Sequence, residues 1–264
     1  MEHWEFGVLG VIDYRRESTL CAYFDMLATL RGRTQGAVCE VGVFSGMSLA
    51  AAGLFLREHD DVRDLIGFDS FSGFPTTGPE DDPAMFEDLL KRGEISADHW
   101  ERVLRNRDLL RVVGRSPSAA TVSTSGSFDR TSEELVRDKL RFLDLDATLI
   151  IGPIEQTMKP DLMPDLRVAA ALLDCDLYAP HAAALPWLWA RLEEGGFVYL
   201  DDYYSLKFPG ARLAVHRFLE GRRDAQLIQV GADEGFERWA IIKGSADSAV
   251  VRELRTQGPQ VMPR

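Results

Sequence analysis

Short apolar runs alternate with stretches of helical periodicity through the middle of the chain. Runs bounded by Gly, Pro or Asp predict buried strands over 37–41, 65–69, 147–152, 167–173 and 197–200. Apolar residues at helical spacing predict helices over 48–58, 181–191 and 210–220. Strands that alternate with helices are typical of a parallel sheet covered on both faces. The pattern therefore predicts an α/β, doubly wound, Rossmann-like fold.

The two ends of the chain carry different patterns. Apolar residues at helical spacing predict a leading helix over 14–32, within an N-terminal helical segment of 1–36. Runs at 226–230 and 236–242 flank a Gly-bearing turn and predict an antiparallel strand pair that closes the sheet edge. We interpret residues 1–264 as a single domain, with a loose polar tail from Ser245.

Residues 75–147 are too long for an ordinary connection between parallel strands, which needs about a dozen residues. Within this insert, the pattern predicts helices over 85–92, 97–107 and 131–143. Ser96 is expected to cap the second, and a capping box beginning at Thr131 to open the third. An insert on the ligand-binding edge is typical of a lid or a substrate-selecting element. A surface decoration or an oligomer contact is the alternative.

Charge and composition exclude some classes of function. The formal net charge of the 264 residues is −12, and no basic stripe offsets it, which argues against a nucleic-acid partner. No stretch approaches the roughly 18 apolar residues of a membrane span. The three cysteines stand in apolar contexts at no metal-ligand spacing, as in proteins of a reducing compartment. We expect a cytoplasmic protein.

Acidic residues end two successive strands. Asp174 and Asp176 close one strand, while Asp201 and Asp202 close the next, which a turn at 193–196 is expected to begin. Because the carboxyl ends of parallel strands share one edge of the sheet, these carboxylates should converge there. Their repulsion is relieved by a hard divalent cation that prefers oxygen ligands, such as Mg²⁺. Acids at strand ends are otherwise ordinary solvated loop residues.

A glycine-bearing turn follows the first strand. Gly42 and Gly46 allow a ligand to approach the backbone, and the following helix presents free N–H groups. The pattern E-x-G-x-x-x-G, starting at Glu40, differs from the G-x-G-x-x-G of dinucleotide-binding proteins. Asp69 ends the second strand, where an acid can accept both hydroxyls of a ribose; the alternative is a turn or capping residue. Gly152, after the third strand, would flank an adenine.

In this order the motifs resemble the macrocin O-methyltransferase (TylF-like) family of S-adenosylmethionine (SAM)-dependent enzymes. The resemblance runs from about residue 37 to 220. Its motifs are E-x-G-V-x-x-G-x-S at 40–48, D-S-F-x-G-x-P at 69–75, G-x-x-x-x-T at 152–157, D-x-D-x-Y at 174–178, G-G-y-v-x-x-D-D-Y at 195–203 and G-A-R-x-A-V-x-x-F at 210–218. The family has D-G-D where this chain has Asp174-Cys175-Asp176, and 75–130 matches little of it.

The resemblance implies a class I SAM methyltransferase sheet with a helical lid and Mg²⁺-dependent methyl transfer to a sugar hydroxyl. The acceptor would be a nucleotide-linked deoxysugar or a glycosylated natural product, and the enzyme a homo-oligomer. Carried over by position, Asp176 would be the general base. The metal ligands would be Asp174, Asp201 and Asp202. The cofactor-binding residues would be Glu40, Gly42, Gly46, Ser48, Asp69, Ser70, Gly152, Ile154 and Asp174.

Several alternatives stay open at this point. His181 is a rival general base, and a metal-free enzyme could use Asp201 and Asp202 to orient its substrate. The acceptor could instead be a catechol or another phenol. A non-catalytic SAM-binding protein on the same fold is a further hypothesis. A nucleotide-dependent oxidoreductase would want the G-x-G-x-x-G motif, which is absent.

Overall fold

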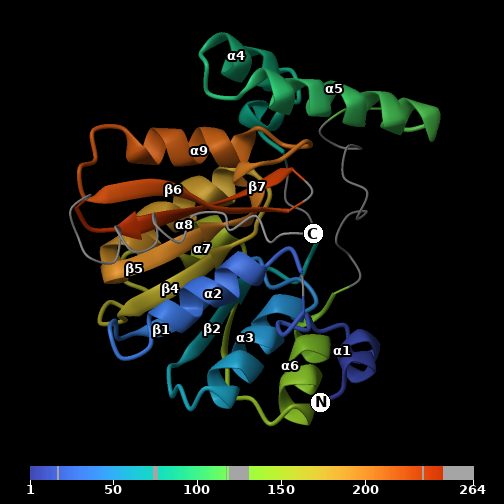
Figure 1. The fold of residues 1–264 in the computed structure, drawn as a ribbon. Helices are drawn as coiled ribbons and strands as arrows, with labels where there is room; N and C mark the ends of the chain where they lie inside the picture. Colours follow the sequence, from blue (N-terminus) through green and yellow to red (C-terminus); the bar gives the residue numbers. More distant parts are fainter. Residues whose placement is uncertain (17, 74–76, 117, 119–130, 234, 246–264) are drawn as a thin grey trace, which may run out of the picture.

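A computed structural model describes residues 1–16, 18–73, 77–116, 118, 131–233 and 235–245. Across these residues, seven strands form one sheet in the order β3-β2-β1-β4-β5-β7-β6 (Figure 1). The parallel strands are β1 (Ala37–Val41), β2 (Leu65–Asp69), β3 (Thr148–Ile151), β4 (Val168–Leu173) and β5 (Leu192–Leu200). The chain reverses its direction of winding between β1 and β4, so the crevice beyond their carboxyl ends is the ligand-binding position of this topology. The predicted doubly wound α/β fold is confirmed.

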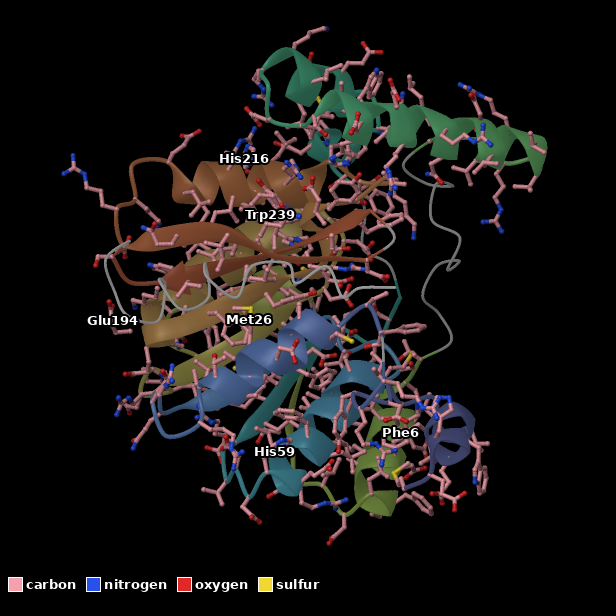
Figure 2. The ribbon with its side chains drawn as sticks, viewed as in Figure 1. Phe6, Met26, His59, Glu194, His216 and Trp239 are labelled. Atoms are coloured by element: carbon pink, nitrogen blue, oxygen red, sulfur yellow. The ribbon has the colours of Figure 1, made fainter. Side chains whose placement is uncertain are left out.

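Residues of β4 alternate between two apolar layers, one on each face of the sheet. Ala170 and Leu172 pack in the layer that contains Met26, whereas Ala171 and Leu173 pack in the opposite layer against Trp239 (Figure 2). The first layer is covered by α1 (His3–Leu9), α2 (Cys21–Thr29), α3 (Met47–Glu58) and α6 (Glu133–Phe142). The second is covered by α7 (Ile154–Thr157), α8 (Tyr178–Arg191) and α9 (Gly210–Leu219). Burial on both faces explains why these strands read as continuous apolar runs.

The C-terminal strand pair forms the predicted antiparallel edge. The strands are β6 (Ala225–Asp233) and β7 (Phe236–Lys243), and β7 pairs with β5 as well as with β6. The turn expected at 193–196 is wrong, because β5 already begins at Leu192 and runs through these residues. The register of β5 against β4 shifts there, from Leu192 opposite Val168 to Phe197 opposite Ala170. Gly195 and Gly196 therefore belong to an irregularity within the strand, not to a turn before it. The tail from residue 246 lies outside the described residues.

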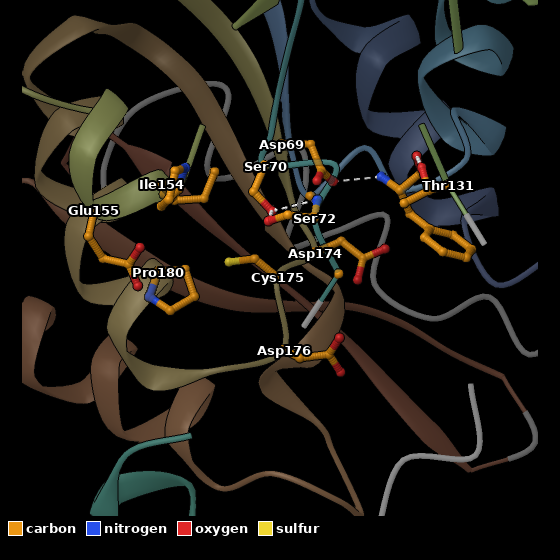
Figure 3. Close-up of a pocket in the computed structure, with 14 residues that line it drawn as sticks. Asp69, Ser70, Ser72, Thr131, Ile154, Glu155, Asp174, Cys175, Asp176 and Pro180 are labelled. Carbon is orange, nitrogen blue, oxygen red and sulfur yellow. Dashed lines mark hydrogen bonds between the residues drawn. The ribbon is translucent and has the colours of Figure 1, made fainter. Parts of the chain in front are cut away.

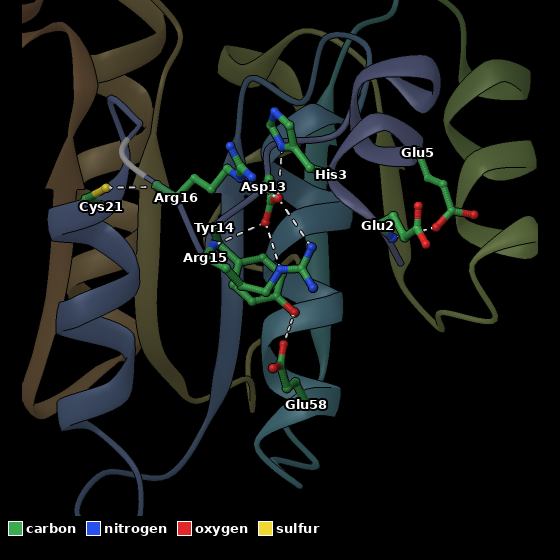
Figure 4. Close-up of polar contacts among 9 residues, drawn as sticks. All are labelled: Glu2, His3, Glu5, Asp13, Tyr14, Arg15, Arg16, Cys21 and Glu58. Carbon is green, nitrogen blue, oxygen red and sulfur yellow. Dashed lines mark hydrogen bonds and ion pairs between the residues drawn. The ribbon is translucent and has the colours of Figure 1, made fainter.

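The N-terminal segment holds two helices, whereas the pattern predicted one. The expected helix over 14–32 is wrong in its first part, since α2 begins at Cys21, and α1 was not predicted. Asp13 stops a helix from forming earlier: its carboxylate accepts from the backbone N–H and the Nε of Arg15, at 3.3 and 2.9 Å (Figure 4). It also pairs with His3 Nδ1 at 3.0 Å, which ties α1 to the loop. Side chain–backbone bonds of this kind compete with helix formation.

The insert divides between two places. After the short helix η1 (Pro79–Asp81), α4 (Met85–Lys91) and α5 (Ala97–Val112) lie beside α9, at the top of Figure 1. There Phe86, Leu89 and Val103 pack with Leu213 of α9. In contrast, α6 packs against α3 in the first apolar layer. One insert therefore contacts both helical layers.

Two capping predictions within the insert have different outcomes. Ser96 caps α5 as predicted, because its Oγ accepts from the backbone N–H of His99 at 3.1 Å. The capping box at Thr131 is wrong: Ser132 caps α6 by accepting from Leu135 N, and the Thr131 hydroxyl binds elsewhere. The Ser- and Thr-rich sequence over 112–128 predicts an irregular stretch, and most of it lies outside the described residues. Within the described part of the chain, no helix has the length and apolarity needed to cross a membrane.

Candidate cofactor and metal site

The turn after β1 passes so close to β4 that only glycine fits. Gly42 has a φ of +95°, and a β-carbon there would lie 1.7 Å from the carbonyl oxygen of Asp174. The strand ends are also hydrogen-bonded, since Asp174 N donates to Val41 O at 2.9 Å. This contact sets the glycine turn directly beside the acidic end of β4.

Asp69 connects the second strand end to the same turn. Its Oδ2 accepts from Phe44 N and its Oδ1 from Phe71 N, both at 2.7 Å. These bonds hold Phe44 at a positive φ of +49°, which a non-glycine residue adopts only under constraint. The carboxylate makes the contacts of a turn residue and also borders the cavity described below. Each oxygen retains a lone pair for a ligand hydroxyl.

Glu40 lies fully buried in β1, below the turn. Ser48 Oγ donates to its Oε1 at 2.7 Å, while its Oε2 has no hydrogen-bond partner among the described residues. Burial raises the pKa of Glu40 to about 8, against the hydrogen bond from Ser48, which lowers it. A buried acceptor with a free oxygen fits a cationic or hydrogen-bond-donating ligand group.

A cavity of about 280 Å³ opens between these strand ends (Figure 3). Its lining includes five of the cofactor residues expected from the sequence: Gly42, Asp69, Ser70, Ile154 and Asp174. The other four, Glu40, Gly46, Ser48 and Gly152, are not among its lining residues. Sequence reasoning missed eight residues of the wall: Phe44, Ser72, Gly73, Thr131, Pro153, Glu155, Cys175 and Pro180. Most of these lie within or beside the motifs, but Thr131 comes from the insert, where the sequence predicted only a helix cap.

Three carboxylates gather where β4 and β5 end, and two of them, Asp174 and Asp176, line the cavity. Asp174, Asp176 and Asp202 each offer an oxygen within 4.8 Å of the others. The backbone N–H of Asp176 donates to Asp202 Oδ2 at 2.7 Å. Burial raises the pKa of Asp174 well above its usual value, and the charges of Asp201 and Asp202 raise it further. Burial likewise raises the pKa of Asp176 to about 6, against the opposing charge of Lys207.

These carboxylates suit a divalent cation in chemistry and in placement. Hard ions such as Mg²⁺ take carboxylate oxygens as ligands, and a double positive charge removes the repulsion that raises these pKa values. Asp201 differs from the other three acids. It lies outside the close group, and its Oδ1 is 3.7 Å from Arg238 NH1 of β7. Of the expected ligands Asp174, Asp201 and Asp202, the structure therefore gathers the first and third together with Asp176.

The rival base His181 is fully buried in α8 and does not line the cavity. Its Nδ1 lies 2.8 Å from Leu177 O and 3.2 Å from Cys175 Sγ. Burial lowers its pKa to about 4. The ring of His181 therefore faces a backbone carbonyl inside the protein, whereas Asp176 lines the cavity.

Known proteins resemble this chain in sequence. A family profile described as a methyltransferase domain matches residues 39–203. Mycinamicin III 3''-O-methyltransferase of Micromonospora griseorubida is 31% identical over 193 residues, which are 72% of this chain and 63% of that protein. The 8-demethyl-8-(2,3-dimethoxy-alpha-L-rhamnosyl)-tetracenomycin-C 4'-O-methyltransferase of Streptomyces olivaceus is 30% identical over 184 residues, 69% of this chain and 58% of that protein. The matched part thus spans about three fifths of each relative's length.

Solved structures resemble the fold. The O-methyltransferase NovP superposes with a TM-score of 0.59 at 21% identity, over 86% of this chain and 79% of NovP. The calicheamicin methyltransferase CalS11 gives a TM-score of 0.57 at 19% identity, over 85% of this chain and 77% of CalS11. At these identities the likeness shows the architecture alone.

Proposed function

The chain belongs to the methyltransferase-domain family, and on that basis we propose that it is a SAM-dependent, divalent-metal-dependent O-methyltransferase acting on a sugar hydroxyl. The two relatives support the sugar acceptor, because both are named as O-methyltransferases of antibiotic pathways and one name specifies a rhamnosyl group. The activities in these names are also consistent with the resemblance to the TylF-like family. The acceptor would be a nucleotide-linked deoxysugar or a glycosylated natural product of secondary metabolism.

One structural relationship carries the proposal: the glycine turn and the carboxylate group meet at Asp174. Its backbone carbonyl abuts Gly42 of the turn, while its side chain belongs to the group with Asp176 and Asp202. A cofactor on the turn and an ion on the carboxylates would therefore be neighbours. Methyl transfer needs this proximity, since the acceptor oxygen must lie in line with the methyl group.

The residues divide the chemistry between them. When bound, SAM supplies an electrophilic methyl group and the divalent ion lowers the pKa of the acceptor hydroxyl. Asp69, which lines the cavity, would accept from the ribose hydroxyls, and Glu40, whose Oε2 has no partner among the described residues, would accept from a cationic group beside the turn. We assign Asp174, Asp201 and Asp202 to the ion. The geometry favours Asp174 and Asp202 most directly.

Asp176 is the proposed general base. A sugar hydroxyl is a weak nucleophile near neutral pH, so its proton would leave as its oxygen takes the methyl group and the bond from that methyl group to the cofactor sulfur breaks. A carboxylate oxygen of Asp176 would take that proton. The hydrogen bond from Asp176 N to Asp202 Oδ2 holds the base against the ion-binding residues, where the activated hydroxyl would lie.

Calorimetry and a transfer assay test this proposal. We expect S-adenosylhomocysteine (SAH) to bind with micromolar affinity in the presence or absence of Mg²⁺, and also to Asp174→Ala/Asp201→Ala. Turnover with nucleotide-linked deoxysugars or glycosylated macrolides should stop on addition of EDTA and return with Mg²⁺. A protein that binds no SAM or SAH would refute the enzyme. Turnover that survives EDTA would support a methyltransferase but contradict its dependence on a metal. Turnover of catechols alone would contradict the sugar acceptor and favour a phenolic one.

The proposal includes a small-molecule acceptor, with no nucleic acid or membrane as partner. We further infer a homo-oligomer, on the basis of the N-terminal helices and the long insert, and a cytoplasmic location, on the basis of three cysteines that stand at no metal-ligand spacing. Light scattering of the purified full chain measures the subunit number, and a monomeric mass would contradict this inference.

A further inference from the structure

Helix α6 of the insert, together with Thr131 just before it, contacts the turn after β1 (residues 42–46, the cofactor turn) at Phe44, Ser45 and Gly46. The Thr131 hydroxyl donates to the carbonyl oxygen of Phe44. Lys139 Nζ donates to Ser45 O at 2.8 Å and to Gly10 O at 3.2 Å. Gly46 packs closely against α6, because a β-carbon at this position would lie 3.1 Å from Val136 Cγ1. Two of the turn's carbonyl groups are thus fixed by side chains that lie far away in the sequence.

The ammonium group of Lys139 binds backbone carbonyl groups instead of a carboxylate. Among the described residues, no acid lies within ion-pair distance of its ammonium group, and both of its hydrogen bonds go to carbonyl oxygens. The side chain is half-buried, and burial lowers the pKa of Lys139. Removing an ammonium group from water costs free energy. The hydrogen bonds from Lys139 to Ser45 O and Gly10 O offset that cost. Exposed cations of the same helix instead pair with acids, as Arg141 does with Asp138.

The turn is held from opposite sides at Phe44. Its N–H is bound by Asp69 of β2, and its C=O by Thr131 of the insert. The next C=O, of Ser45, is bound by Lys139. With these groups fixed, the backbone that faces the cavity keeps one orientation before any ligand arrives. Preorganisation of this kind strengthens binding because less conformational entropy is lost on association.

We propose that Lys139, assisted by Thr131, is a positioning residue that fixes the cofactor turn and couples docking of α6 to cofactor affinity. The cofactor's identity rests on the proposed function, but the positioning of the turn does not. By linkage, a ligand on the turn also stabilises the docked α6.

The test compares Lys139→Met, which keeps the aliphatic stem, with Arg141→Met on the exposed face of the same helix. Calorimetry should show SAH affinity about tenfold weaker in Lys139→Met and unchanged in Arg141→Met, as for loss of a charge-assisted hydrogen bond. The kcat at saturating SAM should stay within about twofold of wild type. Lys139→Arg, which keeps donors, should recover part of the affinity, and Thr131→Val should weaken binding where Thr131→Ser does not.

Hydrogen exchange in the ligand-free protein gives a second readout. The Gly46 amide, which donates to Val43 O at 2.8 Å within the turn, should exchange faster in Lys139→Met than in wild type or Arg141→Met. Unchanged exchange, or equal loss of affinity in the two Met variants, would overturn the positioning role. If wild-type protein binds no SAH, the proposed function fails, whereas faster exchange at Gly46 would still support Lys139.

Discussion

The backbone N–H of Asp176 donates to Oδ2 of Asp202 at 2.7 Å, although both side chains are acidic. The bond links the residues that follow β4 and β5, and Asp176 adopts a positive φ of +57°. Burial raises the pKa of Asp202 well above its usual value, and the charge of Asp176 raises it further, although the hydrogen bond itself lowers it. A structural hydrogen bond thus maintains an electrostatic conflict that ion binding would relieve.

Asp202→Asn should weaken Mg²⁺ binding more than Asp201→Asn does. Asp202 belongs to the close carboxylate group, whereas Asp201 lies beside Arg238. We expect a loss of at least about 100-fold for Asp202→Asn and about tenfold for Asp201→Asn, since a ligand outside the close group should contribute no more than the roughly 10- to 100-fold of a residue that supports a metal site. Calorimetric titration with Mg²⁺ measures both. Equal losses would show that the two acids ligate alike.

Gly42→Ala should destabilise the protein by more than about 3 kcal/mol, because its β-carbon would overlap the Asp174 carbonyl and its φ is positive. Gly93→Ala is the matched control. Gly93 also has a positive φ, of +69°, but no atom lies within 4 Å of its would-be β-carbon, so the cost should be about 1 kcal/mol. Urea unfolding gives both values. Similar costs would mean that the strand ends separate easily.

Asp81→Ala should lower both stability and turnover. Asp81 is buried at the start of the insert and accepts from Tyr178 N and Gly78 N, each at 2.8 Å. Tyr178 begins α8, two residues after Asp176, so the same bond fixes the segment that carries the base. Loss of both acceptors should cost about 2 kcal/mol and reduce kcat more than it changes SAH affinity.

The control for Asp81 is Asp88→Ala, whose exposed carboxylate makes a 3.5 Å contact with Lys91. It should change the free energy of unfolding by less than about 0.5 kcal/mol. Equal kcat values for Asp81→Ala and Asp88→Ala would show that the contact between the insert and α8 does not affect turnover.

His99 should make the stability of the fold depend on pH. It lies buried in α5 of the insert, stacks on Tyr204, and has an Nε2 2.9 Å from Ser205 O. Burial lowers its pKa to about 4, from an ordinary value near 6.5. Between these values the unfolded chain binds a proton that the folded chain does not, so stability falls as pH drops from 6.5 to 4.

His99→Gln should lower the slope of the free energy of unfolding against pH. The expected decrease is about 1.4 kcal/mol per pH unit within that window, which is the contribution of one proton. Urea unfolding at several pH values compares the slopes of the variant and the wild type. His181, also buried with a pKa near 4, should keep its own contribution in the variant. Identical slopes would show that His99 is protonated in the folded protein.

Local signals in the sequence predicted the sheet and the acids at its edge. Buried strands leave continuous apolar runs, and Gly42 and Asp174 stand directly at the ends of two such runs, so counting residues was enough to place them. The close approach of these two residues explains why the turn requires glycine.

Long-range contacts explain what the sequence did not predict. Asp201 turns toward Arg238, a residue of β7 that no spacing near the acids identifies. Thr131 was read as a helix cap because it precedes two glutamates, yet its hydroxyl binds the carbonyl of Phe44. The same tertiary contacts place Lys139 on the turn. Such partners are chosen by packing between elements, which periodicity does not encode.

The strand order also has a consequence for synthesis on the ribosome. β7 lies between β5 and β6, although it follows both in the chain. Until residues 236–243 emerge, β5 has an unpaired edge, and Asp201 lacks Arg238 as its neighbour. A nascent chain that has already made its glycine turn and acidic strand ends therefore carries an open strand edge, which favours association with other chains. Asp201 therefore gains Arg238 as its neighbour only after β4 and β5, which carry the acids, have been translated.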